Sequence, residues 1–539
     1  MRSLSVQASG AGKDAINAYV PKLVEDSVAS RIMAKDATLW GPETEPEASK
    51  RLDWVDLARS SRPLVQEIID LRESFAVEGV DRFVLAGMGG SSLAPELITS
   101  TVGVPLTVLD STDPEQVHAA LEGGLQRTAM IVSSKSGSTL ETDSQLRIFA
   151  EAFADAGIAA PSRIVVVTDA GSALDNQARE DGYRRVFNAN PNVGGRYSAL
   201  TAFGLVPSGL AGADLGQLLD DAEEAARILA EDSAENMGLR LGAALGGTNP
   251  LRDKIVIVDE SSGLNGFASW AEQLIAESTG KAGTGLLPVV AEHGAPETLD
   301  PDHDIQLVRL ISPEAEAAPN GAEVWVAGSL GGQLLLWEFA TVVAGRILGI
   351  NPFDQPDVEA AKKAARGLLD QEPQPSPAVA TFGDIEVRGT EDITHDPQSL
   401  DAALESLFST LGPDGYLSIQ AYLNREADHL GPIRSQLSRV TGRPVTFGWG
   451  PRFLHSTGQF HKGGPSVGVF LQITAETTSD LKIPGREFSF GDLIAAQAAG
   501  DAQVLAEHDR PVLRLHLLDR SRGLAQLQSA VTRISDVRK

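Results

Sequence analysis

The chain of 539 residues contains no cysteine. Disulfides, thiolate nucleophiles and cysteine-ligated zinc sites are therefore excluded. It also lacks any apolar run near the roughly 18 residues that a bilayer-spanning helix needs. Residues 1–13 are polar and lack the apolar segment of a secretory signal. These absences predict a cytoplasmic protein with no membrane partner.

Positive charge is also scarce, with 45 Lys and Arg against 73 Asp and Glu and a formal net charge of −28. Nucleic acids and anionic membranes need clustered cations, so neither is expected as a partner. A small anion can still be held locally by backbone N–H groups, hydroxyls and a few cationic side chains. The 42% hydrophobic content and 53 glycines favour a globular α/β protein of about three or four domains or subdomains.

Short strands alternate with helical stretches along the first 350 residues, which predicts parallel sheets with helices on both faces. In the first part, helices are expected over 14–35 and 62–76 and strands over 82–86, 105–109, 129–133 and 163–168. In the second part, helices are expected over 218–230, 264–278 and 332–348 and strands over 254–259, 305–310 and 323–327. We therefore predict two similar α/β units in tandem.

A Pro-rich polar stretch follows and reads as a linker over residues 371–379. Beyond it, strands are expected over 416–422, 444–447, 468–474 and 511–517. The predicted division is N-terminal helices with a first unit over 1–205, a second unit over 206–370, and a C-terminal α/β domain over 380–539.

Two strands of the first unit end in loops suited to phosphate. The strand at 82–86 leads into Gly-Met-Gly-Gly-Ser-Ser over 87–92, and the strand at 129–133 leads into Ser-Lys-Ser-Gly-Ser-Thr over 134–139. Glycines allow close backbone approach, and a following helix N-terminus supplies free N–H donors. The candidate phosphate ligands are Gly90, Ser91, Ser92, Ser134, Lys135, Ser136, Ser138 and Thr139.

The paired loops resemble the phosphate-binding loops of the sugar-isomerase (SIS) fold. Three further motifs, at 193–198 (Val-Gly-Gly-Arg-Tyr-Ser), 273–281 (Gln-Leu-Ile-Ala-Glu-Ser-Thr-Gly-Lys) and 352–362, are similar to those of glucose-6-phosphate isomerases, in order and approximate spacing. The chain most resembles the isomerase part of bacterial transaldolase/glucose-6-phosphate isomerase fusions, without a transaldolase barrel. The resemblance implies two tandem sugar-isomerase units and reversible conversion of glucose 6-phosphate and fructose 6-phosphate through an enediolate, as in glycolysis and gluconeogenesis.

The resemblance also implies roles for individual residues. Glu277 takes the place of the base, and Gln273 lies one helical turn earlier on the same face. Arg196 would stabilise the enediolate. Lys362 would help to open the sugar ring, and Gln355 would hydrogen-bond on the phosphate side.

Histidine is where the chain departs from the family pattern. The usual ring-opening histidine precedes the 352–362 motif, but a similar segment lies here in the third unit, over 455–463. We hypothesise that this unit folds back, or that a partner subunit supplies it, so that His461 completes the site. His455 is the second candidate, and a surface loop without catalytic function is the alternative.

Two other functions remain open from the sequence. One is a dual phosphoglucose/phosphomannose isomerase, and the other is a non-catalytic phosphosugar-binding regulator, which would need neither Glu277 nor Arg196. No cofactor is expected, and the nine histidines show no metal-ligand spacing. The expected ligand is a small sugar phosphate, while a homo-oligomer and a pathway partner such as transaldolase are left open.

Overall fold

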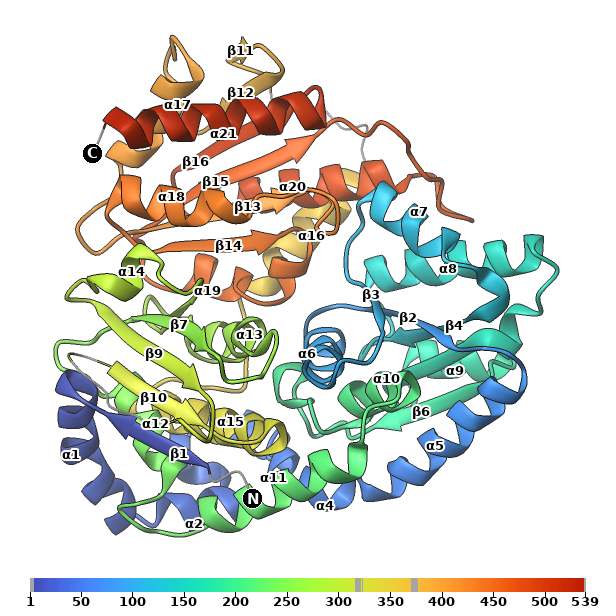
Figure 1. Cartoon of the computed structure of the whole chain (residues 1–539), viewed down its shortest axis with the longest axis vertical. Helices are drawn as coiled ribbons and strands as arrows, with labels where there is room; N and C mark the ends of the chain where they lie inside the picture. The colour runs from blue at the N-terminus through green and yellow to red at the C-terminus, as the bar shows by residue number, and fades with distance from the viewer. Residues whose placement is uncertain (1–3, 316–320, 322, 370–376, 538–539) are drawn as a thin grey trace.

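The computed structural model describes residues 4–315, 321, 323–369 and 377–537, apart from three side chains of one helix. Its strands form three separate sheets, of five, five and six strands. Figure 1 shows the third sheet and most of its helices, in orange and red, at the top of the molecule, above the second unit and next to helix α7 of the first. The mixed α/β class with parallel-sheet units confirms the prediction from the sequence.

The first sheet is parallel throughout, in the order β3-β2-β4-β5-β6. Its strands are β2 (Arg82–Gly87), β3 (Thr107–Leu109), β4 (Thr128–Ser133), β5 (Ile164–Asp169) and β6 (Arg185–Ala189). Its helices are α5 (Arg62–Val77), α6 (Leu93–Val102), α7 (Pro114–Glu122), α8 (Leu140–Asp155), α9 (Ala173–Glu180) and α10 (Ala202–Ala211). Both phosphate loops leave the carboxyl ends of neighbouring strands, β2 and β4, where open α/β sheets bind ligands.

The second sheet has the order β1-β10-β9-β7-β8, parallel except for the antiparallel edge strand β1. Its strands are β1 (Ser5–Ala8), β7 (Lys254–Glu260), β8 (Leu287–Ala291), β9 (Ile305–Ile311) and β10 (Glu323–Ala327). Its helices are α1 (Gly10–Glu25), α2 (Val28–Met33), α11 (Leu215–Leu229), α12 (Met237–Gly246), α13 (Phe267–Thr279), α14 (Pro296–Leu299) and α15 (Leu330–Leu348). Short helices α3 (Glu45–Ala48) and α4 (Leu57–Ser60) lie between α2 and α5.

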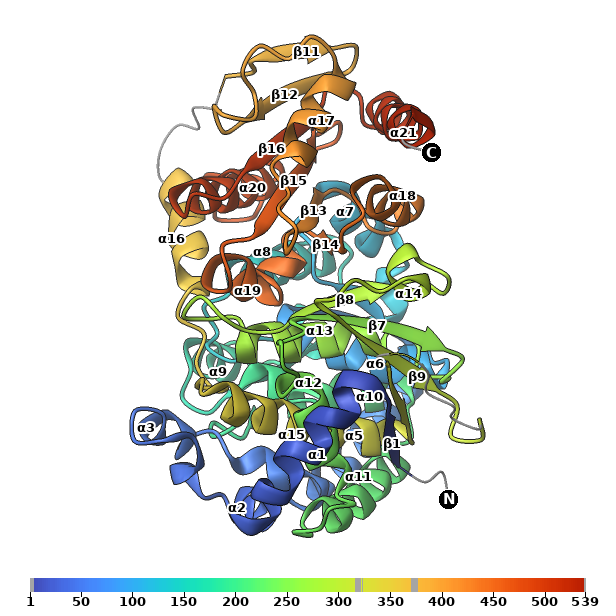
Figure 2. The same ribbon diagram turned by 90° about the vertical axis from the view of Figure 1, so that its left-hand side faces the viewer.

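The third sheet has the order β11-β12-β16-β15-β13-β14, with β13 to β16 parallel. Its strands are β11 (Ala380–Phe382), β12 (Ile385–Gly389), β13 (Tyr416–Tyr422), β14 (Val445–Trp449), β15 (Gly468–Ala475) and β16 (Val512–Leu517). Its helices are α16 (Val358–Leu369), α17 (Leu400–Ser409), α18 (Gly431–Thr441), α19 (Gly458–Gly463), α20 (Phe490–Glu507) and α21 (Arg520–Val537). In the side view, α20 and α16 lie on one side of this sheet and α18 and α21 on the other (Figure 2).

The third unit is packed into the other two rather than tethered beside them. Phe490 and Leu493 of α20 belong to the core that covers one face of the first sheet. Tyr416 and Phe470 of the third sheet share a core with Val256 of β7. Because these buried contacts fix its position, side chains of the third unit can be held against the carboxyl ends of the first sheet.

The strands that the sequence did not predict lie at sheet edges or are short. β8 contains Pro288, which an edge strand tolerates because one side of it needs no ladder hydrogen bonds. β6 is half exposed and lacks a continuous apolar run. The helix expected over 14–35 is divided at Ser27, whose φ of 52° interrupts it. β1 pairs with β10, so this N-terminal strand belongs to the second sheet, although the sequence placed residues 1–205 with the first unit. The domain boundaries remain predictions.

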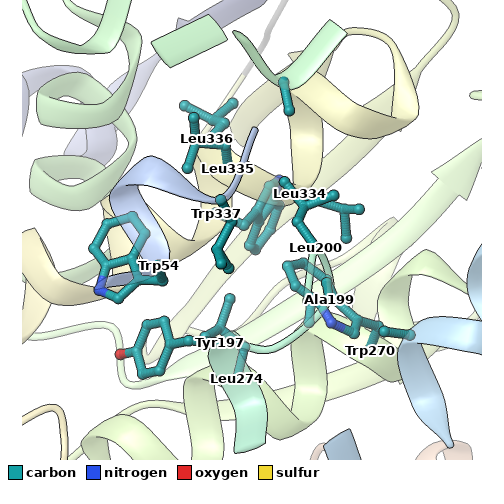
Figure 3. Close-up of a cluster of buried hydrophobic side chains, with 14 of the residues drawn as sticks. Trp54, Tyr197, Ala199, Leu200, Trp270, Leu274, Leu334, Leu335, Leu336 and Trp337 are labelled. Atoms are coloured by element: carbon teal, nitrogen blue, oxygen red, sulfur yellow. The ribbon is translucent and has the colours of Figure 1, made fainter. Parts of the chain in front are cut away.

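A cluster of aromatic side chains supports the turn that carries Arg196. Tyr197 stacks on Trp54 at a centroid distance of 5.7 Å and lies 6.0 Å from Phe353. Figure 3 shows Trp54, Tyr197, Leu274 and Trp337 in one buried cluster drawn from helices of both units. Trp54, Tyr197 and Trp337 are at most 1% exposed, so the turn rests on a rigid base.

Candidate active site

Arg196 is the centre of a buried polar cluster. It lies in a single 3₁₀ turn, Gly195–Tyr197, and is only 3% exposed. Its Nε donates to Oγ of Ser278 at 2.7 Å, and its Nη2 donates to the carbonyls of Pro352 (2.7 Å) and Asp354 (3.1 Å). Three fixed acceptors on two segments therefore hold the guanidinium in one orientation.

The remaining nitrogen of Arg196 reaches two residues that the sequence predicted. Nη1 donates to Oε1 of Gln355 at 2.9 Å and lies 3.4 Å from Oε2 of Glu277. Glu277 is 8% exposed, on the last turn of α13. The structure thus brings a candidate base, a fixed cation and Gln355 together from three distant parts of the chain.

Gln273 lies one turn before Glu277 on α13 and is 3% exposed. Its Nε2 donates to the carbonyl oxygen of His455 at 2.8 Å. Its Oε1 is buried, and within the described residues it accepts no hydrogen bond. That oxygen is therefore available to accept a hydrogen bond from a ligand hydroxyl.

The first phosphate loop is locked against the Arg196 turn. A Cβ on Gly90 would lie 2.0 Å from the carbonyl oxygen of Gly195, so only glycine allows this approach. Gly89 has a φ of +56°, and a Cβ there would lie 2.8 Å from the carbonyl oxygen of His455. Ser92, which is fully buried, donates to the carbonyl of Gly89 at 3.1 Å, whereas Ser91 is half-buried. The loop backbone therefore contacts both the arginine turn and the third unit.

The second loop precedes α8 and holds its own shape. Oγ of Ser134 lies 3.0 Å from Oγ1 of Thr139 and accepts from the N–H of Gly137 at 3.2 Å. The hydroxyls of Ser136 and Ser138, 2.8 Å apart, are on exposed residues at the entry to the helix. These two hydroxyls and the helix N-terminus form a surface suited to an anion.

Lys135 differs from its neighbours in the second loop because its side chain already forms an ion pair. Its Nζ lies 2.7 Å from a carboxylate oxygen of Asp169 and donates to the carbonyl of Pro191 at 3.3 Å. Its charge is therefore partly neutralised by the end of β5.

His455 reaches the first unit from the third. Its Nε2 lies 3.0 Å from Oε1 of Glu141, in the first turn of α8. The same carboxylate oxygen accepts from Nε2 of Gln497 at 2.8 Å, and Oε1 of Gln497 accepts from the hydroxyl of Thr112 at 2.7 Å. The ring is thus oriented by a buried chain of polar groups, while its backbone carbonyl is fixed by Gln273.

His461, the first choice from the sequence, is placed elsewhere. It is 2% exposed on α19, with Nδ1 2.9 Å from Oη of Tyr416 and Nε2 3.4 Å from Oγ of Ser418. The ring stacks on Tyr416 and meets Phe470 edge-on, and burial holds its pKa well below the ordinary value. Both nitrogens are engaged inside the third unit, so His455, six residues earlier, is the histidine that the fold brings to Gln273 and Glu141.

Lys281 also belongs to this cluster, although the sequence did not indicate a role for it. Its Nζ donates to the carbonyl of Asn351 and to the side chain of Asp354, at 2.7 and 2.8 Å. Burial lowers its pKa to about 8, and the nearby charge of Arg196 adds to this shift. Its position as the last residue of the motif at 273–281 is the one sequence feature that could have indicated a place in the site. Lys362 lies on α16, and its side chain is outside the described residues.

One group with metal-like spacing occurs in the described part of the chain, formed by His303, Asp304 and Asp414. Asp304 already pairs with Lys254 and Arg443, which is the arrangement of a structural ion-pair network. This group of three residues includes none of the side chains around Arg196. The described helices also include none that is long and apolar enough to span a membrane.

Known proteins are similar to this chain over the region that contains the candidate site. A model of the phosphoglucose isomerase family matches residues 64–287, which include both phosphate loops, Arg196 and Glu277. A probable glucose-6-phosphate isomerase of Haloarcula marismortui is 30% identical, over 56% of this chain and 81% of the relative. The chain belongs to the phosphoglucose isomerase family. The glucose-6-phosphate isomerase of a Synechococcus species is 28% identical, over 58% of this chain and 73% of its own length.

One solved structure is similar to this chain in both fold and sequence. A hypothetical protein of Thermus thermophilus superposes with a TM-score of 0.58 at 25% identity, over 68% of this chain and all of the other. Membership of the phosphoglucose isomerase family gives the cluster around Arg196 a chemical context.

Proposed function

We propose that this protein is an aldose–ketose isomerase that interconverts glucose 6-phosphate and fructose 6-phosphate by proton transfer through an enediolate. The observation that carries the proposal is the buried contact between Arg196 and Glu277 beside two phosphate-type loops. A binding protein needs the loops but has no use for a carboxylate aimed beside a fixed cation. Homologues named glucose-6-phosphate isomerase support the choice of substrate.

In this proposal the substrate phosphate lies at the second loop, between the exposed hydroxyls of Ser136 and Ser138 and the N–H groups that begin α8. The remaining candidate phosphate ligands contribute backbone and hydroxyl donors or shape the loops. The sugar then extends towards α13, where the free Oε1 of Gln273 accepts a hydrogen bond from a hydroxyl.

The proton transfer falls to Glu277. Its carboxylate removes the proton from one of the two carbons between which the carbonyl moves and returns it to the other. Negative charge builds on the enediolate oxygens, and Arg196, already held by Ser278 and two carbonyls, stabilises that charge without having to move. Gln355 and Lys281 keep the cluster assembled.

Ring opening needs a group that moves a proton to or from the ring oxygen. We assign this step to His455, because Glu141 orients its ring and Gln273 fixes its backbone next to the base helix. Lys362 keeps the supporting role that the family resemblance gives it. His461 is kept out of this role by its burial in the third unit.

The test of the reaction is a coupled assay for glucose 6-phosphate formed from fructose 6-phosphate. Glu277→Gln keeps the size of the side chain and removes the base, so turnover is expected to fall by roughly 10²- to 10⁴-fold with little change in KM. Glu272→Gln, five residues earlier on α13, is the matched control and should keep wild-type turnover. Wild-type protein that binds the sugar phosphate without turnover would instead support a regulator.

The same assay started from mannose 6-phosphate tests the dual-specificity alternative. We further propose a cytoplasmic location, supported by the absence of cysteine. A homo-oligomer and a transaldolase partner remain predictions from the family resemblance.

A further inference from the structure

The third unit contains a cavity of about 1140 Å³ that the proposed isomerase chemistry does not use. It lies between α20 and the face of the third sheet that this helix covers. The helix contributes alanines to the wall, among them Ala496, Ala499 and Ala502, whose side chains are too short to fill the space. The cavity opens to solvent, and its volume is comparable to that of a small-molecule site.

The sheet face of this cavity is polar. Strand register places Gln420, Gln472, Arg514 and Arg388 in one row across β13, β15, β16 and β12. Residues paired in this way project to the same face, which would ordinarily be apolar beneath a covering helix. Arg514 and Arg388 both line the cavity, and so does Tyr422, two residues after Gln420 on β13.

Neither arginine has a carboxylate partner for its whole guanidinium group within the described residues. Nε of Arg514 donates to Oε1 of Gln472 at 2.8 Å, and no carboxylate of the described residues forms an ion pair with it. Arg388 pairs with Glu386, but its Nε is buried without a hydrogen-bond acceptor in the described part of the chain. Burial lowers the pKa of Arg514 and the charge of Arg388 lowers it further, while Tyr422 and Asp501 oppose this shift only in part. An arginine buried beside another cation is costly unless an anion joins it.

Tyr422 adds a neutral donor to the same cavity. It is 3% exposed, and its hydroxyl is buried with no hydrogen-bond partner among the residues described. Burial raises its pKa well above the ordinary value, so the hydroxyl keeps its proton and can donate. A buried polar group left unpaired in this way indicates a missing partner.

We propose that this cavity binds a phosphate monoester of about the size of a nucleoside monophosphate. Guanidinium groups bind phosphate oxygens in a fork geometry, and a dianion matches the two arginines, with Tyr422 donating to the same group. The volume is far larger than one phosphate ion needs, so the ligand carries an organic part. Four carboxylates, those of Glu476, Asp480, Glu487 and Asp492, also line the cavity, and they favour an organic part with hydroxyl or amino donors over a polyphosphate.

The test uses AMP as the probe and isothermal titration calorimetry on the full chain, where the cavity variants separate binding in the cavity from binding elsewhere. One AMP should bind per chain. Arg514→Gln should weaken binding by about tenfold to a hundredfold, the loss expected for a charged hydrogen-bonding group. Ala499→Phe fills the cavity from the helix side and should weaken binding without altering charge. Arg533→Gln, at an exposed arginine on α21, is the control and should bind as wild type does.

The proposal is overturned if wild-type protein does not bind AMP, or if both cavity variants bind it with wild-type affinity. Inorganic phosphate binding as tightly as AMP would also overturn it, because the organic part would then contribute nothing. Isomerase turnover should be unchanged in both cavity variants. Loss of turnover in the wild type with AMP binding intact would instead count against the proposed function alone.

Discussion

Replacing Gly90 with alanine tests how tightly the first phosphate loop must pack against the arginine turn. The added Cβ would lie 2.0 Å from the carbonyl oxygen of Gly195 and 2.4 Å from its carbonyl carbon, whereas ordinary contact begins near 3.4 Å. The two loops must therefore separate by about 1.4 Å, and both atoms are backbone, so no side-chain rotation relieves the clash. Arg196 follows Gly195 directly, and the displacement is transferred to the guanidinium.

A misplacement of about 1 Å in a catalytic group can cost on the order of 10²-fold in rate, so kcat/KM for fructose 6-phosphate should fall by about that factor. The free energy of unfolding should fall by roughly 1–3 kcal/mol, the usual cost of overpacking. Gly195→Ala is the matched control, because a Cβ there meets nothing within 4 Å. Steady-state kinetics and thermal unfolding measure the two effects. Wild-type kcat/KM in Gly90→Ala, or an equal loss in Gly195→Ala, would refute the reasoning.

The remaining predictions concern contacts between the third unit and the first. Burial opposes ionisation of Glu96, but Arg452 and Arg425 hold its pKa well below the ordinary 4.5. The stability that this carboxylate contributes is therefore present above about pH 4.5 and lost as the pH falls further. Denaturant unfolding followed from pH 7 to pH 3 should show a steeper loss in wild type than in Glu96→Gln, and parallel curves would contradict this. His455→Asn should slow turnover of cyclic substrate by about 10²-fold or more while sparing open-chain substrate. A comparable selective loss in a correctly folded His461→Asn variant would reverse the assignment.

Much of the fold could be predicted because a parallel strand buried on both faces has a continuous run of apolar residues. β2, β4 and β5 were located within about one residue, and each is buried over almost its whole length. β1, β6, β8, β11 and β12 were missed. All of them except β12 are edge strands, and β12 has only five residues. The two phosphate-type loops could be recognised for a related reason, because close backbone approach restricts positions such as Gly90 to glycine.

The choice between His455 and His461 could not be made from the sequence. Both lie in one short segment with similar neighbours, and the deciding property is which surface each meets after the third unit docks. His461 points into its own sheet against Tyr416, whereas His455 lies in the turn that reaches Glu141. The contact of His455 with Glu141 joins residues more than 300 positions apart, which no local pattern can indicate.

By itself the sequence determined the α/β class and the two loops, because local backbone geometry and hydrophobic periodicity restrict those residues. The pairing of Arg196 with Glu277 was implied by the resemblance to glucose-6-phosphate isomerases. The tertiary structure alone decided that Gln355, Ser278 and Lys281 assemble around Arg196. It also decided that the third unit brings His455 to the first and leaves a cavity lined by arginines under an alanine-rich helix. The physical reason is that ion pairs, burial and cavities between elements arise only when distant surfaces pack together. A local sequence pattern therefore cannot predict them.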